Sequence, residues 1–437
     1  MSIEYKKPII MKRKTKNIQP YQLIDLANLF NTKKFYELKK ASLSILESKP
    51  DNINALNALA ISYKELGDSK KAQEVYVKLV NSGPKQDFIF SNAGNFFFGI
   101  GKIDQALHCH THAIKLNPKN INSISQTGLI LSNMGKNEEA INYYKKVIKI
   151  DANQKSVYIK IGNAYRAMEK YDKAAKYYEL SNEKLAKCQQ LECFYMLGDQ
   201  EQFYKKLDAF SNSNPPHPLA ATLSSHASIR FSRKDNYSFC RKPFELVEKS
   251  SLFDSDDLND KLIDDFFKCF NELKISVKQQ SLLTNGVQSS GNIFLINQLP
   301  ITTVKNIILE KIELYKKKFA NKNTGFISHW PKKYNLYGWL IIMNNGGQLG
   351  AHMHKEGWLS GAIYFERPKK LSKHDGDIAF SLHGSNYPAD NKTFETRVVE
   401  IEKGDIVLFP SSLFHRTIPF ESEKRRITLA FDIKPLG

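Results

Sequence analysis

The sequence predicts a two-part fold, with an α-solenoid in the first half and a β-sandwich or jelly roll in the second. Three observations lead to this prediction. Small, aromatic and proline residues recur every 34 positions over residues 51–186. After residue 335 the spacing of apolar residues changes from about 3.6, typical of helices, towards 2, typical of strands. A stretch rich in Ser, Asn and Pro at 211–225 separates the two patterns.

Size and composition fit a folded protein of more than one domain. The chain has 437 residues, of which 41% are hydrophobic and 25% charged, and these values exclude a wholly disordered chain. No run approaches the roughly 18 apolar residues that a membrane-spanning helix needs, so we expect no membrane association. The five cysteines are scattered and lack a metal-binding spacing, and the N-terminus has no secretory signal. These features favour a reducing cytoplasm.

The net charge of +19 is mostly lysine and is spread along the chain. It is concentrated only at residues 1–16, which we interpret as a flexible basic tail. Such a tail is either simply solvated or contacts nucleic acid or an anionic surface. Basic charge alone does not predict a nucleic-acid-binding protein.

The 34-residue pattern has a direct physical interpretation. Small residues let two antiparallel helices approach closely, bulky residues fill the groove beside them, and proline ends the second helix. The matched small residues are Ala60, Gly94, Gly128 and Gly162, then Gly67, Gly101 and Gly135, and then Ala72, Ala106, Ala140 and Ala174. The matched aromatic residues include Tyr76, Tyr144 and Tyr178, and the prolines are Pro50, Pro84 and Pro118. The pattern therefore predicts stacked helical hairpins.

This period and pattern resemble the tetratricopeptide repeat. Four units are clear, at residues 51–84, 85–118, 119–152 and 153–186. A degenerate unit precedes them at about 17–50 and a helical pair closes the stack at 187–210, which gives a repeat domain over 17–210. The resemblance implies a concave face that binds a protein or peptide partner. A spacer or a dimerisation element is the alternative.

Three histidines in the second unit resemble a metal site. His108 and His112 are four residues apart, a spacing that places both on one helix face. His110, however, occupies the place of Tyr76 and its equivalents, and no further ligand is near in the sequence. We therefore predict that His110 is a packing residue.

A connector at 211–255 precedes a second domain at 256–437. Helices are expected over about 255–273 and 304–320. Short β-branched or aromatic runs follow, separated by turn residues, at 337–343, 358–365, 377–383, 396–401, 405–409 and 426–432. Many short strands within about 100 residues are typical of a sandwich or jelly roll.

Three groups of residues in this β-rich domain could act together. His352 and His354 are two apart, so in a strand both imidazoles would face the same side. A Gly-Asp turn and a buried strand lead to Pro410, after which a loop is expected to present His415. Arg426 and Thr428 begin the final strand. Each feature alone is weak evidence for a functional site. Their order and spacing make chance less likely.

The arrangement resembles the iron(II)- and 2-oxoglutarate-dependent oxygenases, which fold as a double-stranded β-helix, a form of jelly roll. The resemblance covers roughly residues 330–437. It is nearest to a group of oxygenases in which an H-x-H pair is followed by Ser-Gly, Tyr, Phe-Pro, His and Arg-Ile. Several members of this group carry tetratricopeptide repeats upstream. The matching residues are His352, His354, Ser360, Gly361, Tyr364, Gly404, Phe409, Pro410, His415, Arg426, Ile427 and Phe431.

The resemblance implies a hydroxylase-type dioxygenase. His352, His354 and His415 would bind Fe(II), leaving positions open for the co-substrate 2-oxoglutarate and O₂. Arg426, helped by the Thr428 hydroxyl, would bind the distal carboxylate of 2-oxoglutarate. The reaction would give succinate, CO₂ and a hydroxylated product, with ascorbate as a stimulant, and the repeats would recruit a protein or peptide substrate.

One departure from the wider superfamily leaves alternatives open. The second ligand is usually Asp or Glu, and here it is His354, so either the site has three histidines or a carboxylate such as Glu356 completes it. A second hypothesis is a repeat-based scaffold whose β domain retains a metal without turnover. A third is a three-histidine cupin-type dioxygenase that does not use 2-oxoglutarate and needs no carboxylate anchor.

Overall fold

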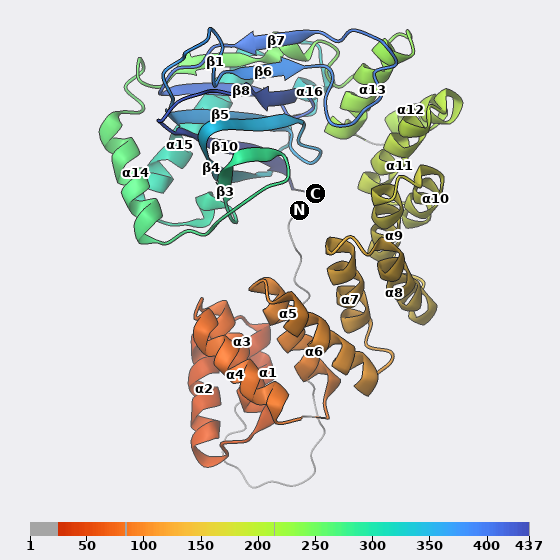
Figure 1. Ribbon diagram of the computed structural model, residues 1–437, viewed down its shortest axis with the longest axis vertical. Helices are drawn as coiled ribbons and strands as arrows, with labels where there is room; N and C mark the ends of the chain where they lie inside the picture. The colour runs from red at the N-terminus through yellow and green to blue at the C-terminus, as the bar shows by residue number, and fades with distance from the viewer. Residues whose placement is uncertain (1–24, 84, 214, 437) are drawn as a thin grey trace. The chain divides into compact units, whose positions relative to one another are not determined.

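The computed structural model describes residues 25–83, 85–213 and 215–436 (Figure 1). The basic tail predicted at 1–16 lies outside these residues. The chain divides into two compact units after Ala186. The first is helical and the second contains an antiparallel sheet, so the predicted fold class is confirmed. No helix of the described residues is long and apolar enough to span a membrane.

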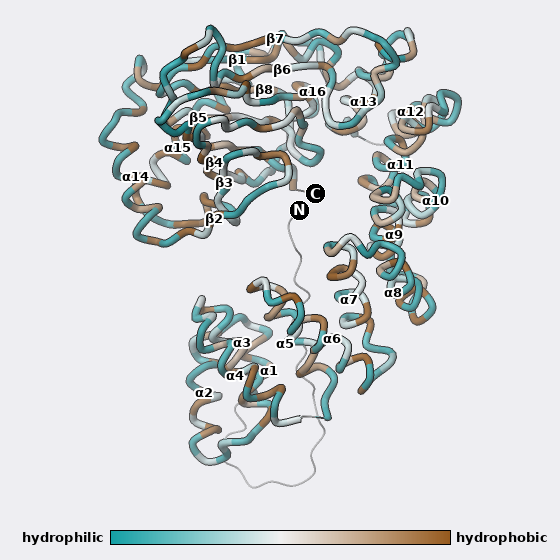
Figure 2. Tube along the Cα trace, viewed as in Figure 1, coloured by the Kyte–Doolittle hydropathy of each residue, from teal (hydrophilic) through white to brown (hydrophobic). Residues whose placement is uncertain are grey.

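The first unit is a series of antiparallel helical hairpins. Figure 2 shows polar and apolar residues mixed along each helix, as expected for amphipathic helices that bury one side. The helices are α1 (Leu26–Asn31), α2 (Phe35–Ser48), α3 (Ile53–Glu65), α4 (Ser69–Asn81), α5 (Asp87–Gly99), α6 (Ile103–Leu116), α7 (Ile121–Asn133), α8 (Asn137–Ile150), α9 (Lys155–Ala167) and α10 (Tyr171–Ser181). Their boundaries follow the predicted 34-residue units.

A glycine facing an aromatic ring holds the two helices of a hairpin together. A Cβ atom built on Gly128 would lie 2.6 Å from the ring of Tyr144, closer than side chains tolerate. The pair formed by Gly94 and His110 has the same geometry, with 2.7 Å to the imidazole. His110 is fully buried, and its Nδ1 lies 3.3 Å from Ser123 Oγ. It is therefore a packing residue, as predicted.

Replacing His110 by tyrosine should reduce the loss of folding stability at acid pH. Burial lowers the pKa of His110 from 6.5 to about 4, so between these values the unfolded chain binds more protons than the folded one. Stability is therefore lost as the pH falls through this window, by up to about 3 kcal/mol for this group. His110→Tyr installs the ring that Tyr144 provides in the next unit and removes this contribution.

The measurement is the urea midpoint of wild type and His110→Tyr at pH 7 and pH 4.5. We expect a smaller acid-induced drop in the variant. His108→Tyr, at an exposed position of the same helix, is the control. An equal fall in the urea midpoint of wild type and His110→Tyr would contradict the assignment of His110 as a buried packing residue.

The second unit combines helices with a sheet. Its helices are α11 (Lys184–Leu197, which begins just before the division), α12 (Gln200–Ser213), α13 (Pro218–Arg230), α14 (Asp260–Glu272), α15 (Leu299–Lys318) and α16 (Gly325–Ser328), with 3₁₀ turns η1 (Pro243–Leu246) and η2 (Ile293–Leu295). Its strands are β1 (Glu248–Ser251), β2 (Val277–Lys278), β3 (Leu283–Ser289), β4 (Tyr334–His352), β5 (Leu359–Glu366), β6 (Ile378–Ser381), β7 (Thr396–Val399), β8 (Asp405–Pro410), β9 (Phe414–Thr417) and β10 (Arg426–Pro435). The sequence patterns did not predict α13, α16, β1, β2, β3 or β9.

Strand β4 changes partners along its length and so curls the sheet. The strand order is β1-β8-β5-β10-β4-β9-β6-β7, and every pair is antiparallel. Residues 334–343 of β4 pair with β10, whereas Leu349 and His352 pair with β9. Gly346 lies between the two parts with a φ of +70°, which glycine adopts without strain. The bend places β9, β6 and β7 in a second layer.

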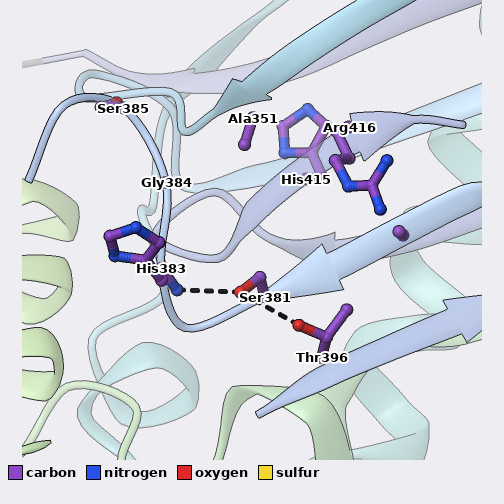
Figure 3. Close-up of a pocket in the computed structure, with 9 residues that line it drawn as sticks. Ala351, Ser381, His383, Gly384, Ser385, Thr396, His415 and Arg416 are labelled. Atoms are coloured by element: carbon purple, nitrogen blue, oxygen red, sulfur yellow. Dashed lines mark hydrogen bonds between the residues drawn. The ribbon is translucent and has the colours of Figure 1, made fainter. Parts of the chain in front are cut away.

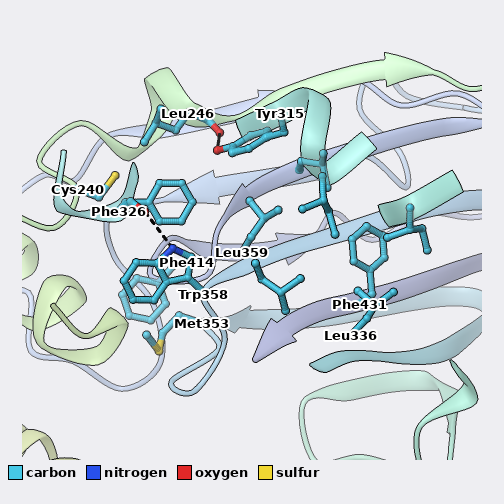
Figure 4. Close-up of a cluster of buried hydrophobic side chains, with 14 of the residues drawn as sticks. Cys240, Leu246, Tyr315, Phe326, Leu336, Met353, Trp358, Leu359, Phe414 and Phe431 are labelled. Carbon is cyan, nitrogen blue, oxygen red and sulfur yellow. Dashed lines mark hydrogen bonds between the residues drawn. The ribbon is translucent and has the colours of Figure 1, made fainter. Parts of the chain in front are cut away.

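Strand β10 is buried on both faces. Alternate residues Ile427, Leu429, Phe431 and Ile433 pack in a large core together with Ile308 and Ile312 of α15 and other helical residues. Figure 4 shows this core, in which Tyr315 donates a hydrogen bond to the Leu246 carbonyl and Trp358 Nε1 donates one to the Phe326 carbonyl. The other face of β10 carries Arg426, Thr428, Ala430 and Asp432, which are also buried. Polar residues thus occupy three of these four buried positions.

Candidate metal centre

Three histidines converge where β4 meets β9. His352 ends β4 and lies opposite His415 of β9 in the strand register, and His354 follows two residues later. The ring centroids are 4.3 Å apart for His352 and His415, 5.2 Å for His352 and His354, and 5.0 Å for His354 and His415. One ring nitrogen of each lies within 4.8 Å of those of the others. A single ion could contact all three.

Two details of the expected geometry were wrong. His415 lies on strand β9, not on a loop, and it pairs with both β4 and β6. His354 lies beyond the end of β4, so it reaches the cluster through the turn after the strand and not through strand alternation. The four-residue strand β9 is too short for an alternating pattern to be recognised in the sequence.

The hydrogen bonds that Nδ1 donates determine which nitrogen of each imidazole is free. His352 Nδ1 lies 2.8 Å from the Gly350 carbonyl oxygen, and His415 Nδ1 lies 3.3 Å from that of Leu413. A carbonyl oxygen only accepts, so each Nδ1 carries the proton and each Nε2 keeps a lone pair. His354 Nδ1 lies 2.6 Å from Asp432 Oδ1, which leaves its Nε2 free as well. Three Nε2 atoms are therefore available as ligands.

Burial disfavours the protonated form of two of the three histidines. It lowers the pKa of His352 to about 4, with the neighbouring His354 adding to the effect. Burial lowers the pKa of His415 well below its usual range, again helped by the other two histidines. Neutral imidazoles are the form that binds metal ions.

A buried network of hydroxyls and one carboxylate supports His354. Ser360 Oγ donates to Asp432 Oδ1 at 2.7 Å and lies 2.8 Å from Ser411 Oγ. Asp432 and Ser411 have no role in the sequence analysis. The signal that could have found Asp432 is its place in the series Arg426, Thr428 and Asp432, polar residues at every second or fourth position of an otherwise apolar strand.

Arg426 and Thr428 lie at the other end of the same face of β10. The Arg426 guanidinium is buried, with Nη1 donating to Thr428 Oγ1 at 2.8 Å and Nε to the Gly376 carbonyl at 2.9 Å. It lies 5.0 Å from the ring centroid of Tyr364, whose buried hydroxyl has no hydrogen-bond partner in the described chain. Arg426 forms no ion pair with any described residue. A buried cation and an unpaired hydroxyl fit an anionic ligand.

Two other sets of potential ligands do not complete the centre. Glu356 is exposed and pairs loosely with Lys434 at 3.9 Å, and it is not part of the histidine cluster. A second group of potential ligands comprises His374, Asp377 and Glu400. There Lys370 Nζ already lies 2.9 Å from Asp377, so a cationic side chain neutralises that group.

A pocket of about 340 Å³ borders the histidine cluster (Figure 3). Its lining is mostly small or polar and consists of Ala351, Ala379, Ser381, His383, Gly384, Ser385, Thr396, His415 and Arg416. Arg416 follows His415 in β9, so the two side chains lie on opposite faces of the strand. The pocket thus lies along β9 beside one of the three histidines.

Comparison with protein families matches both halves of the chain. The family described as "Putative 2OG-Fe(II) oxygenase" matches residues 337–432, which contain all three histidines and Arg426. The families described as TPR repeat and tetratricopeptide repeat match 128–168, and 53–85 with 156–183. The chain joins tetratricopeptide repeats to a 2OG-Fe(II) oxygenase domain.

Several solved structures are similar to part of the chain. MamA is 25% identical, with 36% of this chain and 93% of that one covered and a TM-score of 0.34. PilF of Pseudomonas aeruginosa is 19% identical over 45% and 91%, with a TM-score of 0.38. YrrB, described as a TPR protein with an unusual peptide-binding site, is 19% identical over 36% and 80%, with a TM-score of 0.33. No curated protein matches the sequence.

Proposed function

We propose that the chain is an iron(II)- and 2-oxoglutarate-dependent dioxygenase of the hydroxylase type. The observation that carries the proposal is the presence, in one domain, of three convergent imidazoles and a buried arginine that forms no ion pair in the described chain. The family match supports the same class of chemistry. Five cysteines without disulfides fit a protein of the reducing cytoplasm.

The donor set fits iron(II). His352, His354 and His415 would hold the ion through Nε2, each fixed by its Nδ1 hydrogen bond. The ion would supply the redox chemistry that couples decarboxylation of 2-oxoglutarate to oxidation of a substrate by O₂. Neutral imidazoles leave positive charge at the centre, which a dianionic co-substrate would reduce.

The second half of the site fits the co-substrate. Arg426 offers a planar pair of donors, and Thr428 and Tyr364 add hydroxyls beside it. A carboxylate bound there would pair the buried guanidinium and satisfy the Tyr364 hydroxyl. Burial within the domain excludes water, which strengthens this ion pair. Arg426 would thus orient 2-oxoglutarate by its distal end, and the substrate would occupy space beside the histidines.

Replacing Arg426 distinguishes the 2-oxoglutarate-dependent oxygenase from the cupin-type dioxygenase and the scaffold. A charge-assisted hydrogen bond contributes about 1.5–3 kcal/mol, so Arg426→Ala should raise the KM for 2-oxoglutarate by about tenfold or more. The assay follows succinate from the full chain with Fe(II), O₂, 2-oxoglutarate and ascorbate. His415→Ala should abolish the activity. Arg425→Ala, at the exposed neighbouring position, is the matched control and should leave it unchanged.

Other results would favour another function. Turnover of O₂ that needs no 2-oxoglutarate and survives Arg426→Ala would favour a cupin-type dioxygenase. Wild-type protein that binds neither iron nor 2-oxoglutarate would favour the scaffold.

The repeats would recruit a protein or peptide substrate on their concave face, which we assign to the first helices of the hairpins. A polar seam joins these helices: Asn92 Nδ2 donates to Asn57 Oδ1 at 3.2 Å, and Asn122 Nδ2 donates to Ser91 Oγ at 2.7 Å. The seam also contains side-chain amides whose buried oxygen has no partner in the described chain, namely Asn95, Asn122 and Gln126. Rotating these amides would offer acceptors to the N–H groups of an extended peptide.

Removing two of these amides should weaken peptide binding. Peptides selected from a display library on the full chain should lose about tenfold or more in affinity for the double variant Asn122→Ala, Gln126→Ala, because two hydrogen bonds are lost. Asn142→Ala, which removes an exposed amide from α8, is the control. Selected peptides that bind the double variant and wild type equally would place the binding face elsewhere.

A further inference from the structure

Asp432 is a buried carboxylate held directly behind one imidazole of the cluster. Its Oδ1 lies 2.6 Å from His354 Nδ1 and accepts from Ser360 Oγ at 2.7 Å. Asp432 is only 4% exposed, and His354 is its one ion-pair partner in the described chain. A carboxylate is not left this deeply buried without a compensating group, so the charge of Asp432 must be matched by His354 or by what His354 binds.

We infer that Asp432 is a positioning residue that supplies, through His354, the negative charge that a carboxylate ligand would give directly. This inference rests on the proposed function, because it concerns the same metal centre. The 2-His-1-carboxylate centre of non-haem iron oxygenases has one anionic ligand. Here the three ligands are neutral imidazoles, and the carboxylate lies one hydrogen bond further out. It makes the Nε2 atom of His354 a stronger donor and fixes its ring orientation.

The surrounding residues hold the carboxylate in this place. Ser360 of β5 and Asp432 of β10 are opposite one another in the strand register, so the sheet itself sets their contact. The turn that carries His354 closes at Gly357, whose N–H donates to the His354 carbonyl. A Cβ atom on Gly357 would lie 2.7 Å from Ser411 Oγ and 3.3 Å from Asp432 Cγ. Glycine at this position therefore lets the His354 turn approach the carboxylate.

Glu356, the other carboxylate considered for this centre, does not supply the negative charge. Glu356, two residues from His354, is directed to solvent near Lys434. Asp432 is the carboxylate in hydrogen-bond contact with the cluster among the described residues. The negative charge beside the centre is therefore supplied by β10, the same strand that carries Arg426.

Metal affinity of the full chain tests this inference independently of turnover. The probe is Co(II), whose visible d–d absorption reports both binding and ligand geometry. Asp432→Asn keeps the shape and a carbonyl acceptor but removes the charge, and it should weaken Co(II) binding about 10–100-fold and shift the absorption bands. Ser360→Ala, which leaves the carboxylate in place, should weaken binding less. Asp405→Asn removes another aspartate that is 4% exposed, paired with Lys249, and should leave affinity and spectrum unchanged.

The outcomes are distinguishable. Wild-type protein that binds Co(II) while Asp432→Asn binds it equally, with an unchanged spectrum, overturns the role of Asp432 and leaves the proposed function standing. Wild-type protein that binds no Co(II) overturns both. If Asp432→Asn does not fold, an affinity of Ser360→Ala equal to that of wild type overturns the inference.

Discussion

The pairing of β4 with β9 is the constraint on which the site depends. It places His352 opposite His415, and the turn that follows brings His354 to the same point. This pairing exists only because β4 leaves β10 near Gly346 and continues into a second layer. A one-residue slip of β9 would turn His415 to the opposite face and remove one of the three imidazoles. The register between two strands therefore determines whether a metal centre can form.

Strand β10 links the metal centre to the predicted co-substrate site. One face packs against the helices that cover the sheet, and the other carries Arg426 at one end and Asp432 at the other. Both are buried charges, and neither has a lysine, arginine or carboxylate partner within the described residues. A buried charge that no lysine, arginine or carboxylate pairs lowers the stability of a folded chain unless another group or a ligand compensates it. We interpret both as sites where stability is given up for binding.

Much of the fold and of the site could be predicted from the sequence, because the signals were periodic or closely spaced. The 34-residue repeat gave the hairpins, and H-x-H with a later His and Arg gave the cluster and the buried arginine. The strand β9 and the helix α13 were missed because one is four residues long and the other lies in a Ser-, Asn- and Pro-rich stretch. Asp432 was missed because its role depends on a contact with a residue 78 positions away, which no local pattern reveals.

The most direct test of the account is the ligand set of the iron-loaded full chain, measured by X-ray absorption spectroscopy under anaerobic conditions. We predict imidazole scattering from three histidines in the wild-type protein, and either one fewer imidazole ligand or no bound iron in His415→Ala. An iron environment that is the same in wild type and His415→Ala, or one that contains a protein carboxylate in place of an imidazole, would contradict the account.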